Sequence, residues 1–152
     1  MNLKAFMVAA ALAATLGIGS IAAADASVAV TLRIVNNNSS STIYHAKNPP
    51  STQSDQFTGV LGWTVAPPDS LLAGASDASS KITLGANQQV VFTFGAPNSA
   101  NPFSNGCTFT IRANGAGTAL MAPVASRIGN ASCAISQPAG QTYNVQATLA
   151  NF

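Results

Sequence analysis

Glutamate is absent from this chain of 152 residues, and the other residues that usually carry chemistry are few. There is one histidine, His45, and there are two cysteines, Cys107 and Cys133. General acid and base catalysis, metal ligation and activated nucleophiles draw mostly on His, Glu, Asp, Cys and Lys. The composition therefore predicts a protein that is not an enzyme, with no catalytic residue, no cofactor and no metal site.

Charge of either sign is also scarce. After residue 24 the chain carries five basic and four acidic side chains, a net charge of +1, and the basic ones are spread along its length. Binding to nucleic-acid phosphates needs clustered Lys or Arg, so we expect no nucleic-acid partner. A net charge near zero favours association. The expected partners are a membrane lipid, a glycan or a host protein surface, together with self-association.

The one long hydrophobic run lies at the start of the chain. Lys4 belongs to a short basic segment, residues 5–18 are apolar, and small residues end at Ala24. This pattern predicts a signal peptide over residues 1–24 and a single domain over residues 25–152. The alternative is an uncleaved membrane anchor, because the stretch is nearly long enough to span a bilayer. We expect a secreted protein, extracellular, or periplasmic in a Gram-negative source.

The two cysteines are expected to be oxidised in an exported chain. A bridge between Cys107 and Cys133 closes a loop of about 27 residues, for which the chain-entropy model gives roughly 3 kcal/mol of stabilisation. A catalytic thiol would need a basic neighbour and a paired histidine, and neither cysteine has them in the sequence. We therefore predict a structural disulfide.

The periodicity after residue 24 is that of half-buried strands. Strands are predicted at residues 27–35, 42–46, 59–65, 81–84, 89–94, 107–112, 119–122, 132–136 and 142–149. Residues 85–88 predict a hairpin between two of them, and residues 71–78 allow at most one or two helical turns. Short strands divided by Gly, Pro and Asn turns indicate an antiparallel sandwich or barrel. We predict an all-β fold, a single antiparallel β-sandwich with one disulfide.

Four aromatic residues are the candidate surface-binding residues: Tyr44, Phe57, Trp63 and Phe103. Aromatic side chains near loops anchor ligands, glycans or membrane interfaces. Exposure is favoured for Phe103, which lies in a polar loop, whereas core packing is favoured for the only Trp of a sandwich. His45 has no second His and no Asp close to it in the sequence, so we expect an ordinary surface or hydrogen-bonded strand histidine.

A family resemblance lies in the first third of the domain. Residues 31–44 are strand-like around an Asn-Asn-Asn-Ser-Ser-Ser turn, Gly62 and Trp63 follow, and residues 66–74 read Ala-Pro-Pro-Asp-Ser-Leu-Leu-Ala-Gly. This part resembles the opening of aegerolysins, small β-sandwich proteins. The resemblance implies a sandwich that binds particular membrane lipids and that can join a partner protein to form pores.

Our leading hypothesis is non-enzymatic recognition of a lipid, glycan or protein surface through the loops at residues 44–57 and 96–103. One alternative is a structural subunit of an extracellular fibre or coat, pilin or spore-coat-like. Apolar and polar residues alternate over residues 143–149, as they do in the last strand of such domains. A strand with an unpaired edge can pair with a strand of another chain. A small secreted effector that acts on a host is also compatible with the composition.

Overall fold

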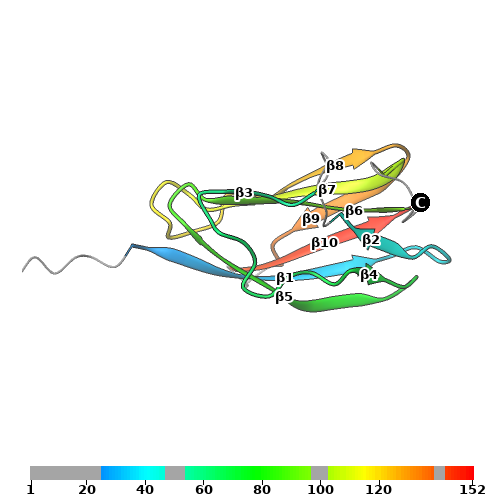
Figure 1. The fold of residues 1–152 in the computed structure, drawn as a ribbon, viewed down its shortest axis with the longest axis horizontal. Coiled ribbons are helices and arrows are strands. Elements are labelled where there is room, and N and C mark those ends of the chain that lie inside the picture. Colours follow the sequence, from blue (N-terminus) through cyan, green and yellow to red (C-terminus); the bar gives the residue numbers. More distant parts are fainter. Residues whose placement is uncertain (1–24, 47–53, 97–102, 139–142) are drawn as a thin grey trace, which may run out of the picture.

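The computed structural model describes residues 25–46, 54–96, 103–138 and 143–152. All regular structure in these residues is β-strand, arranged as two packed sheets (Figure 1). One sheet has the strand order β5-β1-β10-β9, and the other has β4-β2-β6-β7-β8, with β3 also paired to β6. The predicted β-sandwich is confirmed. The predicted signal peptide at residues 1–24 lies outside the described residues.

The first sheet is organised around β1 (Ser27–Asn36), whose side chains alternate between buried and more exposed positions. β1 pairs antiparallel with β5 (Ser76–Gly85) and parallel with β10 (Asn144–Ala150). β10 pairs antiparallel with β9 (Ser132–Ser136). The remaining strand pairs of the described chain are antiparallel as well, so β1 and β10 form the one parallel pair among them.

The second sheet has two long central strands and four shorter ones. β6 and β7 pair in continuous register, from Gln89 opposite Arg112 to Ala96 opposite Asn105. The six strands are β2 (Ile43–His45), β3 (Gln56–Thr58), β4 (Ser70–Leu71), β6 (Gln89–Ala96), β7 (Asn105–Arg112) and β8 (Val124–Ile128).

The core lies between the two sheets, where the alternating apolar residues of both meet. Its largest fully buried side chains are Phe92, Phe94 and Phe109 of the second sheet, packed with Leu32 and Ile34 of β1 and with other aliphatic residues. Cys107 of β7 and Cys133 of β9 form the predicted disulfide, with their Cα atoms 5.6 Å apart. Because β7 and β9 belong to different sheets, this bond ties the two layers together.

A buried polar network fixes the loops near the end of β1. Asn36 is fully buried, and its Nδ2 donates to the carbonyl oxygens of Ser41 and of residues 71–72 at 2.8 to 3.0 Å. Its Oδ1 accepts from the backbone N–H and the side-chain amide of Asn38. The Oδ1 of Asn38 in turn accepts from the backbone N–H of Phe152. Two side chains, Asn36 and Asn38, therefore join the segments that follow β1, β4 and β10.

The predicted hairpin between residues 81–84 and 89–94 is wrong in its pairing. The turn itself is present, with the Gln88 N–H donating to the Gly85 carbonyl at 3.1 Å and Asn87 in the left-handed region at φ 57°. β5 pairs with β1, however, while β6 pairs with β7 in the other sheet. The turn carries the chain across the core, and alternation alone cannot distinguish such a crossover from a hairpin.

Four further segments differ from the sequence prediction. Residues 59–65 form a loop that pairs with β5 only through a bridge between Val65 and Lys81. Residues 71–78 contain the end of β4, a turn and the start of β5 instead of helix. Residues 119–122 contribute one bridge, from Leu120 to Ala113, and no strand. β8 was not predicted, because its side chains do not alternate regularly between buried and exposed.

Candidate functional site

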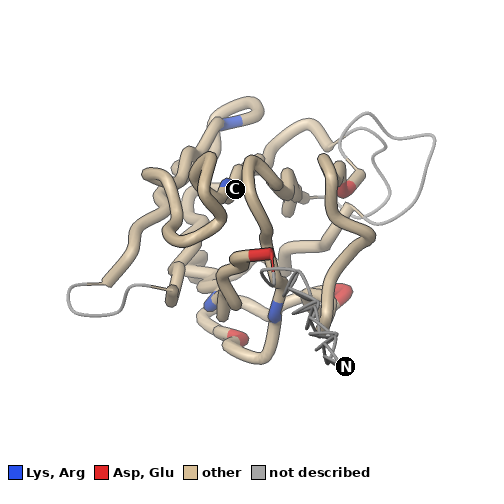
Figure 2. The backbone as a smooth tube through the Cα atoms, turned by 90° about the vertical axis from the view of Figure 1, so that its left-hand side faces the viewer, with Lys and Arg blue, Asp and Glu red and all other residues tan. Residues whose placement is uncertain are grey.

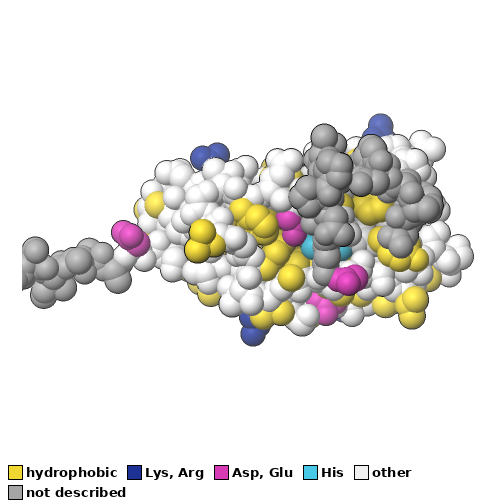
Figure 3. All heavy atoms as spheres, viewed as in Figure 1, with side chains coloured by type: hydrophobic (Ala, Val, Ile, Leu, Met, Phe, Trp, Pro, Cys, Tyr) yellow, Lys and Arg dark blue, Asp and Glu magenta, His cyan; other side chains and the backbone are white. Residues whose placement is uncertain are grey.

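An open hollow of about 380 Å³ lies at the edge of the second sheet beside β2 and β3. On the face drawn in Figure 3, the histidine and an acidic side chain lie among hydrophobic side chains. The hollow thus combines aromatic, acidic and small residues. Its lining consists of His45, Asp55, Phe57, Gly62, Trp63 and Ala66.

The pairing of β6 explains why these residues meet. One edge of β6 is paired with β7 along its whole length, so β2 and β3 share the other edge. His45 at the end of β2 pairs with Phe94, and Gln56 at the start of β3 pairs with Val91. Asp55, which directly precedes β3, is thereby brought beside His45.

Asp55 connects the two aromatic walls of the hollow. Its Oδ1 lies 2.8 Å from His45 Nε2, and its Oδ2 accepts the Trp63 Nε1–H at 2.7 Å. The side chain of Asp55 is 13% exposed and that of His45 is 1% exposed. Hydrogen bonds to a carboxylate are stronger than neutral ones, so the loop that carries Trp63 is tied to β2 through Asp55.

His45 is buried against an aromatic ring of the neighbouring strand. The imidazole stacks on Phe94, with ring centroids 4.8 Å apart and planes 10° apart. Its Nδ1 is buried and has no hydrogen-bond partner among the described residues. The ring is therefore held on one side by Phe94 and at Nε2 by Asp55.

Trp63 and Phe57 are half-buried and pack against the core from the hollow side. The Trp63 ring meets Phe57 edge to face at 6.2 Å and Phe92 at 5.5 Å, both between centroids. Trp63 is therefore both a packing residue and a wall of the hollow. Its loop carries Leu61, whose side chain is fully exposed, between Gly59 at φ 73° and Gly62 at φ 152°.

The other two aromatic candidates lie elsewhere. Tyr44 is half-buried and precedes His45 on β2, so its side chain points to the opposite face of the sheet. The predicted exposure of Phe103 is wrong: the residue is only 8% exposed. Its ring packs over Gly95, where an added Cβ would lie 2.5 Å from the ring. Residues 47–53 and 97–102 of the two predicted binding loops lie outside the described residues.

Sequence reasoning missed the pair of His45 and Asp55. The two residues are hydrogen-bonded, as expected for a strand histidine, but the acidic partner was not identified. The available signal was the position of Asp55 two residues before Phe57 and eight before Trp63. An acidic residue close to two aromatic residues in a chain with so few charges was a reason to consider them together.

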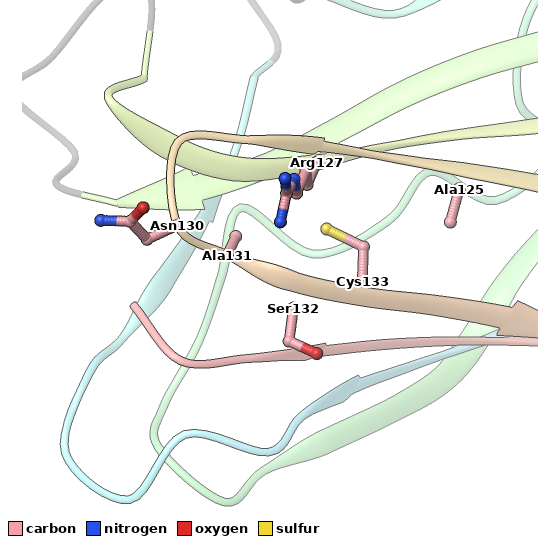
Figure 4. Close-up of a pocket in the computed structure, with 6 residues that line it drawn as sticks. All are labelled: Ala125, Arg127, Asn130, Ala131, Ser132 and Cys133. Atoms are coloured by element: carbon pink, nitrogen blue, oxygen red, sulfur yellow. The ribbon is translucent and has the colours of Figure 1, made fainter.

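A second hollow of about 370 Å³ lies between β8 and β9, beside the disulfide (Figure 4). Arg127 and Cys133 point toward one another across it from the two strands. Arg127 is exposed, and the sequence contains no acidic residue after Asp77. The lining has one charge and no aromatic ring. The first hollow, which has a charged side chain and aromatic rings, is the better candidate for a binding site.

The described residues contain no group of three or more His, Cys, Asp or Glu side chains placed to hold a metal ion. In the same part of the chain, no helix has the length and hydrophobicity needed to cross a bilayer.

No protein-family model matches the chain, and no significant match was found among curated proteins or solved structures. The resemblance to aegerolysins stays a prediction from the sequence.

Proposed function

We propose that this protein is an exported, non-enzymatic β-sandwich that recognises a glycan at the hollow beside β2 and β3. The observation that carries the proposal is the carboxylate of Asp55, held between aromatic side chains in an open hollow. Ligand sites are mostly apolar, with a few placed polar groups. Aromatic rings offer contact area to the C–H faces of a sugar, while a carboxylate accepts hydrogen bonds from its hydroxyl groups.

Two other properties support this proposal. The volume of about 380 Å³ lies within the range of small-ligand sites. Figure 2 shows acidic and basic residues scattered over the described chain without a cluster of one sign. A surface with so few charges suits a ligand that is recognised mainly by hydroxyl and ring contacts. The disulfide fits an oxidising compartment, which supports export.

Membrane binding is supported less well by the described surface. Anchoring to a bilayer uses a large apolar face or a group of basic residues near the headgroups. Leu61 and Val65 are the exposed large hydrophobic side chains of the loop at residues 59–65, and no Lys or Arg of the described residues lines the hollow. We therefore place lipid binding among the outcomes of the test.

The test is binding of the purified protein to a glycan array, followed by calorimetric titration with the glycans that bind. Replacement of Trp63 by Ala should weaken binding by about thirtyfold, as for a residue at the centre of an interface. Because Trp63 also packs on Phe92, the thermal unfolding of each variant is measured, and Phe57→Ala serves as a second wall variant. Val124→Ala removes an exposed apolar side chain on β8 and should leave binding unchanged.

Three results would contradict the proposal. Binding that is unaffected by both wall variants would place the site elsewhere. An absence of glycan binding, with concentration-dependent polymers seen by electron microscopy, would support the fibre or coat subunit. Binding to neutral lipid vesicles that is lost in Leu61→Ser would support a membrane-binding protein.

A further inference from the structure

We infer that the Cys107–Cys133 bond is a site of thiol–disulfide exchange, at which a carboxylate-bearing thiol attacks Cys133 through the hollow between β8 and β9. This inference goes beyond the proposed function, because β8 lies at the other edge of the second sheet from β2 and β4. It depends on three features of the hollow: the unequal exposure of the two cysteines, the position of Arg127 beside them, and the charge of Arg127.

The two sulfur atoms differ in their access to solvent. Cys107 on β7 is 0% exposed, whereas Cys133 on β9 is half-buried and lines the hollow of about 370 Å³. In Figure 4 the Cys133 side chain points into this hollow from β9. The rate of disulfide exchange depends on which sulfur an attacking thiolate can reach. Cys133 is therefore the sulfur that is attacked, and Cys107 is the one that leaves.

Arg127 is placed beside the disulfide by the pairing of β7 with β8. It lies directly opposite Cys107 in the antiparallel register of these strands. Residues that are directly opposite have their side chains on the same face of the sheet, with Cβ atoms about 4.5 to 5.5 Å apart. Arg127 and Cys133 also point toward one another across the hollow (Figure 4). A positive charge therefore stands next to both cysteines at this edge of the sandwich.

No acidic side chain neutralises the charge of Arg127. The guanidinium group of arginine stays protonated in proteins. The acidic residues of the sequence, Asp25, Asp55, Asp69 and Asp77, all lie among the described residues, and none of them forms an ion pair with Arg127. The segments outside the described residues contain neither Asp nor Glu. An anionic group that enters the hollow is therefore attracted.

The reaction exchanges one disulfide for another. The incoming thiolate forms a bond from its sulfur to Sγ of Cys133, and the bond from this Sγ to Cys107 breaks. The electron pair of the broken bond stays on Cys107 as a thiolate, which takes up the proton that the incoming thiol released. A guanidinium group forms charge-assisted, often bidentate hydrogen bonds with a carboxylate. Arg127 therefore draws a carboxylate-bearing thiol to Cys133, and the product loses the covalent bond between the two sheets.

The experiment measures how fast the purified, oxidised protein exchanges with two small thiols of opposite charge. Mercaptopropionate carries a carboxylate, and cysteamine carries an ammonium group. Each rate is divided by the rate of the same thiol with a neutral small-molecule disulfide, which removes the difference in thiol reactivity. We expect mercaptopropionate to exchange about fivefold faster than cysteamine after this correction. The difference should shrink in high salt, because screening weakens the attraction to an exposed charge.

Three arginine variants identify the residue responsible. Arg127→Gln should make the corrected rates of the two thiols nearly equal, while Arg127→Lys should keep most of the preference because the charge is retained. Arg112→Gln is the matched control: Arg112 is also exposed but lies at the end of β7, so its replacement should preserve the preference. Thermal unfolding of the oxidised variants confirms that they are folded.

The position of the adduct is determined separately by mass spectrometry. After a short reaction the free thiol is alkylated and the protein is digested. We expect the mercaptopropionate adduct on Cys133 and the alkyl group on Cys107.

Three results would overturn the inference. An adduct found mainly on Cys107 would show that the attack does not come through the hollow. A preference for mercaptopropionate that survives in Arg127→Gln would mean that Arg127 does not select the thiol. Exchange that is equally fast with both thiols and no faster than global unfolding would show that the disulfide is reached only in the unfolded chain. Glycan recognition is unaffected by any of these outcomes, because it concerns the other hollow.

Discussion

The region around β2, β3 and β4 and the region around β7, β8 and β9 are held together by different means. In the first, the strands are two or three residues long, and the segments between them are fixed by hydrogen bonds that Asn36 donates and that Asp55 accepts. In the second, longer strands pair in regular register, and the Cys107–Cys133 bond joins the two sheets.

The difference shows where a fold of this kind can form a binding site. In the second region, backbone pairing and the disulfide supply most of the order. The first region depends on side chains for its order, so carboxylate, imidazole and indole groups are already held in fixed positions. A satisfied buried polar network, such as that of Asn36, specifies one arrangement, whereas at the hollow the Nδ1 of His45 has no partner among the described residues. The hollow lies in the region that depends on such contacts.

Loss of the disulfide tests the covalently joined region and should have the largest effect. In a Cys107→Ala, Cys133→Ala double variant, we expect the free energy of unfolding to fall by about 3 kcal/mol, because the unfolded chain is no longer constrained. Urea unfolding followed by circular dichroism measures it. Glycan affinity at the hollow should not change in the folded variant. A simultaneous loss of affinity would show that the two regions are coupled.

Replacement of Asn36 tests the region that is held by polar side chains. Asn36→Ala leaves the carbonyl groups of Ser41 and of residues 71–72 without this donor, so we expect a loss of about 2 kcal/mol in urea unfolding. The matched control is Asn37→Ala. Asn37 is exposed, and its replacement should change stability by less than about 0.5 kcal/mol. Similar values for the two variants would rule out the network as a source of stability.

Asp55→Asn is the mildest of the three changes. The amide of Asn has one acceptor oxygen where the carboxylate has two, so residue 55 can no longer accept hydrogen bonds from both His45 and Trp63. We expect a loss of about 1 kcal/mol, measured by thermal unfolding, and a shift in the fluorescence of the single Trp. Arg127→Gln, at the exposed second hollow, is the control. An unchanged emission spectrum together with an unchanged midpoint would contradict the hydrogen bond from Trp63 to Asp55.

The sequence predicted the strands in which apolar and polar side chains alternate, so that one face of the strand is buried. β1 and β10 have apolar residues at every second position, so their existence and their inward faces followed from the pattern. Which strands pair with one another did not follow from the pattern, because β5 and β6 look like the two arms of a hairpin until the other strands are placed. β3 and β4 are too short to show a period in the sequence. Their order comes from contacts with distant residues, with β6 for β3 and with Asn36 for β4.

The candidate site was predictable only in part for a similar reason. Phe57 and Trp63 were chosen from residue type alone, and both line the hollow. The disulfide was predicted from cysteine number and is present. The contact between His45 and Asp55 depends on two short strands that share one edge of β6. No local pattern in the sequence contains that information, because it arises from the order of strands in a sheet.

The parallel pairing of β1 with β10 has a consequence for the time course of folding. β1 can pair early with β5, but its other edge stays open until residues near the far end of the described chain become available. Contacts between residues so distant in sequence form slowly, because a large loop must close first. β9 also lacks its partner within the sheet until β10 is in place. Until β10 is in place the first sheet is incomplete, so the core that this sheet covers stays open on one side.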